Sequence, residues 1–178
     1  GDVSQTTGLK GIGDGIKKFL NAHVTGESTI KPEYMGTGVI VTEPTYKHYI
    51  IEDIDDWNGA MCVEDGLYCA SETRVRLSTS MIKSVSGQMI GDEGLFNLCL
   101  KGSGKVVLES DVPEEELITI DLHNDTLKVD GSYVIAWSEK LDFTVERSGK
   151  TLIGSAASGE GLVNVYRGTG RVLMKPQI

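Results

Sequence analysis

The stretch Gly102-Ser103-Gly104-Lys105-Val106-Val107-Leu108 decides the fold, because the chain contains it in three related copies. The copies lie 66 residues apart, with Gly36-Thr37-Gly38-Val39-Ile40-Val41 first and Gly168-Thr169-Gly170-Arg171-Val172-Leu173-Met174 last. A repeat of this kind is one supersecondary unit that cannot bury its apolar face alone. The sequence therefore predicts a single domain of three stacked pseudo-repeats. The approximate bounds of these units are 1–64, 65–129 and 130–178.

Two further glycine motifs follow the same period. A Gly-Glu loop precedes each copy, at Gly26-Glu27, Gly91–Gly94 and Gly159–Gly161. An Asp-Gly element stands at 65–66 and again at 130–131. The matching position one period before the first of them would lie ahead of residue 1. We therefore expect the first unit to lack its opening strands: either the sequence begins late in this unit, or another chain or element covers the edge they leave.

Composition and patterning predict an all-β fold. The chain has 178 residues, of which 39% are hydrophobic and 24% charged, as in a folded domain with one core. Short runs rich in Val, Ile, Tyr and Thr, bounded by Gly or Asp, indicate a β-sandwich or barrel. The expected strands are 37–43, 47–54, 59–64, 67–77, 95–101, 104–109, 116–122, 126–129, 132–137, 141–146, 151–154, 161–167 and 170–175.

One segment departs from the strand pattern. Apolar residues recur at helical spacing from Leu9 to Leu20, which predicts one short N-terminal helix over 8–22. Three glycines within it weaken the helix by about 1 kcal/mol each. Farther along the chain, Trp57 and Trp137 are expected to anchor the core.

Charge and targeting signals restrict the class of partner. The formal net charge of −9 argues against binding to nucleic acid and to anionic membranes. No apolar run approaches the roughly 20 residues of a membrane span, and residues 1–8 are too polar for a signal peptide. Three cysteines, an odd number without metal spacing, favour a reducing cytoplasm.

Cys62 and Cys69 flank the turn signal Asp65-Gly66, which predicts a two-residue hairpin. In that hairpin the two cysteines are a hydrogen-bonded pair about 5.5 Å apart at Cα, within disulfide range. The alternative interpretation is that the two cysteines are small apolar residues on one face of the hairpin, without a bond between them. The matching pair around Asp130-Gly131 is Leu127 and Val134, which favours free thiols.

Motifs that carry chemistry are weak. His23, His48 and His123 are isolated, so we expect no metal site, no cofactor and no catalytic residues. The three Gly-Ser/Thr-Gly motifs resemble half of a phosphate loop. None of them carries Gly-Lys-Ser/Thr or leads into a helix, so they are interpreted as turns that need positive φ.

The repeated carboxylates Glu27, Glu93 and Glu160 are the candidate ligand-binding residues. If a pseudo-threefold axis relates the units, these three side chains converge and offer oxygen ligands to a hard cation. The alternative is that each carboxylate accepts backbone N–H bonds within its own glycine loop.

Three segments, taken in order, resemble a known family. They are Gly91–Phe96 with Gly102–Val106, Val129–Trp137, and Gly159–Val163 with Gly168–Leu173. They are similar to the altered-inheritance-of-mitochondria family, in the tryptophan RNA-binding attenuation protein-like (TRAP-like) superfamily, whose bacterial members are largely uncharacterised. The resemblance spans nearly the whole chain. It implies TRAP-like β repeats and a homo-oligomer, a trimer being one arrangement, and it implies no catalytic residues.

Three functions follow as hypotheses. The favoured one is a non-enzymatic, oligomeric interaction or structural module. The alternative is a binder of a small ligand or cation at the Gly-Glu loops, between repeats or subunits. An enzyme on a cupin-like barrel comes last, because it needs clustered histidines. Neither tryptophan nor RNA is transferred from the superfamily's namesake, since fold does not carry function.

Overall fold

The structure is a computed structural model of the chain, and it describes residues 4–6, 32–81, 83–84, 96–130, 133–147 and 162–176. These residues form β-strands and two short 3-10 helices, which confirms the all-β prediction. The predicted helix at 8–22 and strand at 151–154 lie outside the described residues.

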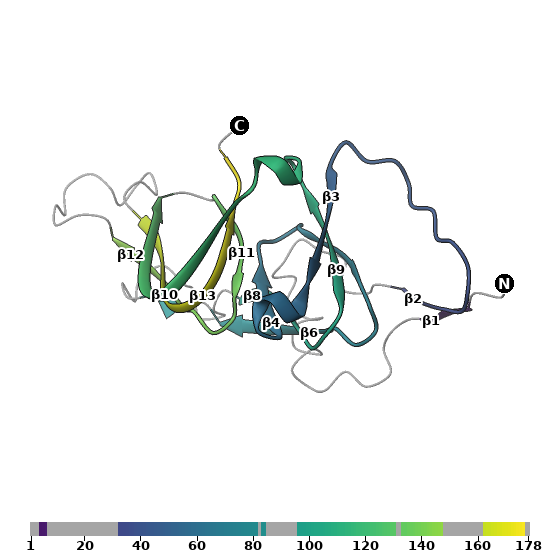
Figure 1. The fold of residues 1–178 in the computed structure, drawn as a ribbon, viewed down its shortest axis with the longest axis horizontal. Coiled ribbons are helices and arrows are strands. Elements are labelled where there is room, and N and C mark those ends of the chain that lie inside the picture. The colour runs from purple at the N-terminus through teal and green to yellow at the C-terminus, as the bar shows by residue number, and fades with distance from the viewer. Residues whose placement is uncertain are drawn as a thin grey trace.

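The described elements follow one another as short strands that are broken by turns (Figure 1). In chain order they are β1 (Ser4–Thr6), β2 (Glu33–Met35), β3 (His48–Asp53), η1 (Ile54–Trp57), β4 (Ala60–Val63), β5 (Tyr68–Ser71), β6 (Arg76–Met81), β7 (Lys83–Ser84), β8 (Phe96–Lys101), β9 (Lys105–Ser110), η2 (Glu114–Glu116), β10 (Ile118–Asp130), β11 (Val134–Ser138), β12 (Asp142–Arg147) and β13 (Leu162–Met174).

The strands form three sheets. The largest has the order β6-β8-β4-β11-β13-β12-β7, with β10 also paired to β13. A second sheet has the order β3-β9-β5, and β1 pairs with β2 in a third. All ladders are antiparallel except that between β7 and β12. Figure 1 shows β10, β12 and β13 at one end of the molecule, β3, β4 and β9 in the middle and β1 and β2 at the other end.

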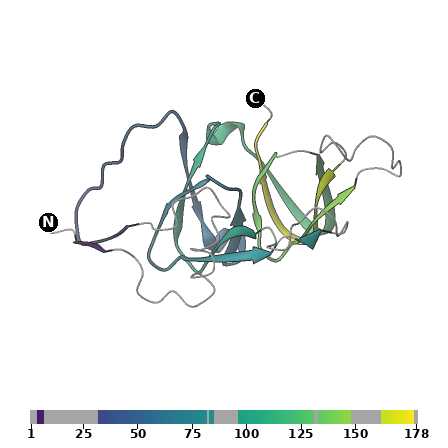
Figure 2. The same ribbon diagram turned by 180° about the vertical axis from the view of Figure 1, so that it is seen from behind.

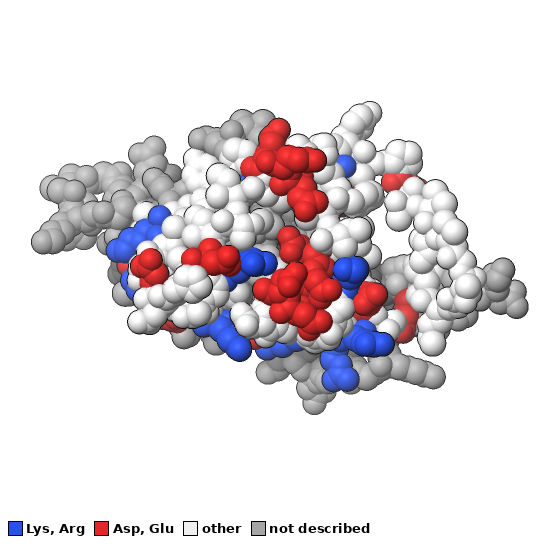
Figure 3. Space-filling view, in the orientation of Figure 1, with Lys and Arg blue, Asp and Glu red and all other residues white. Residues whose placement is uncertain are grey.

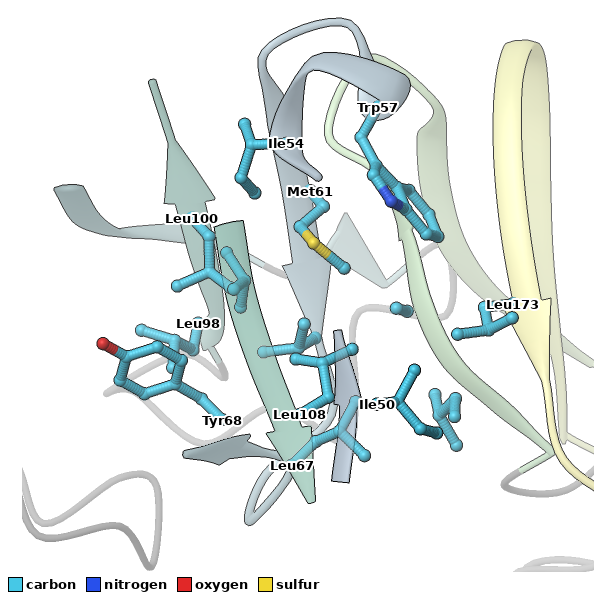
Figure 4. Packing of buried hydrophobic residues seen from close by; sticks show 14 of the residues in the cluster. Ile50, Ile54, Trp57, Met61, Leu67, Tyr68, Leu98, Leu100, Leu108 and Leu173 are labelled. Carbon is cyan, nitrogen blue, oxygen red and sulfur yellow. The ribbon is translucent and has the colours of Figure 1, made fainter. Parts of the chain in front are cut away.

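Two apolar clusters lie between these strands. The first contains Ile50, Met61 and Leu100, all at most 1% exposed, and it receives Leu173 from the far end of β13 (Figure 4). The second surrounds Trp137. Trp57 and Trp137 are 1% and 5% exposed, so the prediction that they anchor the core is confirmed.

The spacing of 66 residues recurs in the register of the ladders. In each of three ladders there is a pair of facing residues for which adding 66 to both residue numbers gives a facing pair in another ladder. The pairs are Ala60↔Lys101 and Thr126↔Arg167, Arg76↔Lys101 and Asp142↔Arg167, and Tyr68↔Leu108 and Val134↔Met174. Backbone geometry follows the same spacing, because Asn58 and Asn124 are both left-handed, with φ of 57° and 55°.

Several predicted strand bounds are wrong. The predicted strand 37–43 is absent, since residues 36–47 form no strand. The predicted strand 67–77 is two strands, β5 and β6, because a turn intervenes in which Val75 N donates to the Glu72 carbonyl at 2.9 Å. Conversely, the segments predicted as 116–122 and 126–129 merge into β10, and those at 161–167 and 170–175 merge into β13.

The predicted hairpin at Asp65-Gly66 is also wrong in its pairing. The turn itself is present, with Gly66 at φ 78° and Leu67 N donating to the Glu64 carbonyl at 3.3 Å. The strands then separate, because β4 pairs with β8 and β11 whereas β5 pairs with β9. The turn therefore carries the chain from one sheet to another.

The cysteine prediction fails for the same reason. Cys62 faces Cys99 of β8, and the two form a disulfide with a Cα–Cα distance of 3.9 Å. The expectation of free thiols considered only the local pair of Cys62 with Cys69. Pairing across the sheet joins residues that are 37 positions apart in the chain.

Candidate functional site

The predicted ligand residues Glu27, Glu93 and Glu160 lie outside the described residues. The described part of the chain contains no group of three or more His, Cys, Asp or Glu residues placed to hold a metal ion. The features that the structure does place are the glycine motifs, a charged contact between β13 and the middle of the molecule, a polar notch and an exposed apolar arm.

The first two Gly-Ser/Thr-Gly motifs, 36–38 and 102–104, are bends outside the strands, whereas the third, 168–170, lies within β13 beside the register shift between Leu122 and Asp125. Gly36, Gly102 and Gly168 have φ of 140°, 129° and 122°, a range that favours glycine. A Cβ atom on Gly102 would overlap the carbonyl oxygen of Arg74. The interpretation as turns is therefore confirmed at 36–38 and 102–104, and it is wrong at 168–170, where the positive φ of Gly168 accompanies an irregularity within a strand.

Each of the last two glycine motifs is followed by a backbone N–H that an equivalent side chain binds. The Glu72 carboxylate accepts a hydrogen bond from Lys105 N at 3.1 Å. The Ser138 hydroxyl accepts one from Arg171 N at 2.9 Å. Both donor and acceptor are 66 positions later in the second case, so these polar groups serve the backbone beside the glycine motif.

A charged contact joins β13 to the middle of the molecule. Arg171 lies over the Trp57 ring at 5.9 Å, and its Nε donates to Asp121 Oδ1 at 3.0 Å. The Trp57 indole donates to Glu52 Oε2 at 3.0 Å. Burial raises the pKa of Glu52 despite this hydrogen bond, and acidic neighbours such as Asp56 add to the increase. Figure 3 shows acidic side chains gathered on this face.

A polar notch lies beside the turn at 64–67. It is lined by Lys47, Glu64, Asp65, Gly66, Leu67, Glu109, Ser110, Asp111, Ile135 and Lys175. Asp111 accepts a hydrogen bond from Lys175 Nζ at 3.2 Å and pairs with Lys47 Nζ at 3.8 Å. Burial raises the pKa of the Glu64 carboxyl, whereas Lys175 lowers it. Asp111 thus has two opposite charges of the protein beside it.

The arm, defined as residues 36–47, connects β2 to β3. It projects from the rest of the molecule as a long loop (Figures 1 and 2). Val39, Ile40 and Val41 are 88%, 59% and 88% exposed. In the described structure, eight of the nine exposed large apolar side chains lie between Tyr34 and Ile51. The arm is therefore the main exposed apolar surface of the described chain.

Patterning found the apolar run of the arm but predicted a paired strand there. The Arg171–Trp57 and Asp111–Lys175 contacts were not predicted at all. Their partners are 114 and 64 positions apart in sequence, too far for local spacing to relate them.

Comparison with known proteins places the chain in a family. The family profile described as "Mitochondrial biogenesis AIM24" matches residues 1–177. The chain belongs to the AIM24 family. A curated relative, an uncharacterised protein of Streptococcus pyogenes serotype M6, is 26% identical over 180 residues, which cover 98% of this chain and 71% of the relative. The resemblance read from the glycine motifs is thereby confirmed.

A solved structure supports the AIM24 fold. The crystal structure of a Streptococcus pyogenes protein, solved as a structural genomics target, aligns with a TM-score of 0.61 at 23% identity. The alignment covers 98% of this chain and 76% of that chain. At this identity the likeness shows the fold alone. Within the described residues of this AIM24 chain, no helix has the length and apolarity to cross a membrane.

Proposed function

We propose that this AIM24-family chain is a non-enzymatic β-repeat protein that acts as an oligomeric interaction or structural module. The observation that carries the proposal is the concentration of exposed apolar side chains on the arm and its flanks, from Tyr34 to Ile51. Soluble monomers rarely expose large contiguous apolar patches, and such patches mark interaction surfaces. The other polar features support this function, because Asp111 and Arg171 have oppositely charged partners within the protein.

The repeat is part of the proposal. The shared register of the ladders, the left-handed Asn58 and Asn124, and the matched bonds to Lys105 and Arg171 support two copies of one unit. The first copy contributes the arm, whose glycine turn has the same positive φ at Gly36. A trimer whose repeats form a larger ring is one assembly compatible with such units.

Light scattering across a micromolar concentration range tests the assembly. The expected result is a defined oligomer whose mass is a whole multiple of the 19.2 kDa chain. A species that stays at the mass of one chain at every concentration would overturn the proposal.

The alternative proposal is a small-ligand or cation site formed by Glu27, Glu93 and Glu160. It is supported by the near-equal spacing of these carboxylates in glycine loops. A ligand that binds only the folded state raises the melting temperature. A screen of divalent cations and small anions should therefore produce a shift that Glu93→Gln removes. A shift that survives this substitution would reject the site.

The cytoplasmic location stays a prediction. It relied on an odd number of cysteines without metal spacing, and the Cys62–Cys99 disulfide weakens that reason, because disulfides persist chiefly in oxidising environments. Titration of thiols in the freshly purified, denatured protein distinguishes the two cases. One reactive thiol per chain supports the disulfide, whereas three support the reducing environment.

A further inference from the structure

The arm differs from its counterparts in the later units. Ile40 is 59% exposed, whereas Val106 and Val172, which lie 66 and 132 positions later, are 0% exposed. Val106 lies in β9, between β3 and β5, and Val172 lies in β13, between β10 and β11. The same type of run is thus flanked by strands on both edges in two units and is exposed in the first.

The sequence of the arm is suited to a strand. Four β-branched residues follow one another from Val39 to Thr42, and Pro44 closes the run. Such a run, left extended in water, exposes apolar surface together with unpaired backbone groups. The arm therefore has the composition of a strand that is completed by another partner.

A receiving surface is present on β3. This strand is at the edge of the β3-β9-β5 sheet. Its Tyr49 and Ile51 are 44% and 61% exposed on one face, while Ile50 on the other face is 1% exposed. The outer face of β3 is therefore apolar and partly exposed among the described residues, with the Tyr49 hydroxyl 3.5 Å from Thr42 Oγ1 of the same chain's arm.

Charge favours contact at the arm between two copies of the chain. Each chain carries a formal charge of −9, so two copies repel one another over most of their surface. Among the arm residues 36–47 the only ionisable carboxylate is Glu43 and the only cation is Lys47, which pairs with Asp111 of its own chain. Figure 3 shows the arm almost entirely without charged side chains and standing clear of the body. Two acidic copies meet there with the least repulsion.

We infer that the arm is the surface through which copies of this chain assemble, with the Val39–Val41 run packed on the exposed face and edge of β3 in a neighbouring copy. This inference rests on the proposed oligomeric function and names its contact. A neighbouring copy is the occupant favoured, because this chain already builds strands that flank such a run twice. Such contacts leave no arm uncovered when two copies exchange arms in a dimer, or when each copy passes its arm to the next around a ring.

The experiment compares three forms of the whole chain by analytical ultracentrifugation. The test variant carries Val39→Asp and Val41→Asp, at positions that are 88% exposed and whose change leaves the buried clusters intact. The matched control carries Ile118→Asp, which places the same type of charge at a 53% exposed site on β10. The double variant should weaken assembly by roughly tenfold or more, since charge would be buried at the contact, and the control should assemble like the wild type.

Hydrogen exchange of the wild type gives a second readout that needs no variant. The amides of residues 39–42 should become protected as protein concentration rises. An oligomer that persists in the double variant, or amides whose protection is independent of concentration, would overturn the arm contact and leave the oligomeric function standing. A wild-type chain that never assembles would reject the oligomeric function itself. Loss of assembly in both variants would also overturn the arm contact, because the effect would not depend on the arm.

Discussion

Cys62 lies directly opposite Cys99 in the β4–β8 ladder, and their disulfide joins strands that are neighbours in the sheet but 37 residues apart in the chain. Both residues are at most 1% exposed and belong to the cluster around Trp137. The bond therefore joins β8 and β4, the second and third strands of the largest sheet, and β4 pairs with β11 on its other edge.

Removal of this bond should destabilise the fold. The loop of 37 residues predicts a loss of about 3 to 4 kcal/mol in the free energy of unfolding, on the chain-entropy estimate. The change is Cys62→Ala with Cys99→Ala, measured by urea denaturation under oxidising conditions. Wild-type protein in reductant is the control and should resemble the double variant. Equal stability of wild type and variant under oxidising conditions would contradict a disulfide at this pair.

The glycine turns allow a matched comparison of backbone and steric costs. Gly102→Ala places a Cβ against the Arg74 carbonyl at φ 129°, so both strain and overlap oppose it. Gly66→Ala introduces comparable strain at φ 78° but meets no atom within 4 Å. We expect Gly66→Ala to cost about 1 kcal/mol and Gly102→Ala clearly more, by thermal or chemical unfolding. Equal costs would mean that the backbone at 102 relaxes away from Arg74.

The polar notch should make stability depend on pH in a defined direction. Burial raises the pKa of Glu64 above its ordinary value of 4.5, so the folded state binds this proton more tightly than the unfolded state. The stabilisation from Glu64 is therefore present in acid and is lost as pH rises through the raised pKa. Glu64→Gln should accordingly gain stability relative to wild type as pH rises from 4 to 7.

Asp111 supplies the opposite control. Its hydrogen bond from Lys175 holds the pKa of the carboxyl below its ordinary value of 3.8, so its contribution is present above that pH and is lost in acid. Asp111→Asn should lose stability near neutral pH and converge with wild type in acid. The measurement is urea denaturation from pH 7 down into acid well below the ordinary Asp111 pKa of 3.8. Curves for Glu64→Gln and Asp111→Asn that run parallel to wild type would contradict both assignments.

Local pattern and spacing could predict much of the architecture. Runs of Val, Ile and Tyr between glycines predicted the strands, because alternation and turn residues act within a few positions. The buried Trp57 and Trp137 and the turn glycines were likewise readable from composition and motif.

Non-local pairing could not be predicted in the same way. The Asp65-Gly66 signal specified a turn but not that β4 and β5 enter different sheets. The partner of Cys62 is set by the β4–β8 register, and the contact of Arg171 with Trp57 by the packing of β13 against η1. In each case the deciding interaction joins residues that sequence spacing does not relate.

The difference between the arm and its counterparts has a consequence for stability at protein concentrations too low for assembly. Ile40→Ala removes more atoms than Val106→Ala, yet Ile40 is 59% exposed and Val106 is fully buried between β3 and β5. We expect Val106→Ala to cost about 2 kcal/mol, because it leaves a cavity in the first cluster, and Ile40→Ala to cost close to nothing. Raising the concentration should then reveal a penalty for Ile40→Ala alone, since the arm contributes stability only where a neighbouring copy covers it. Chemical denaturation at low and high concentration measures both effects. A large penalty for Ile40→Ala in the dilute protein would show instead that the arm packs against its own chain.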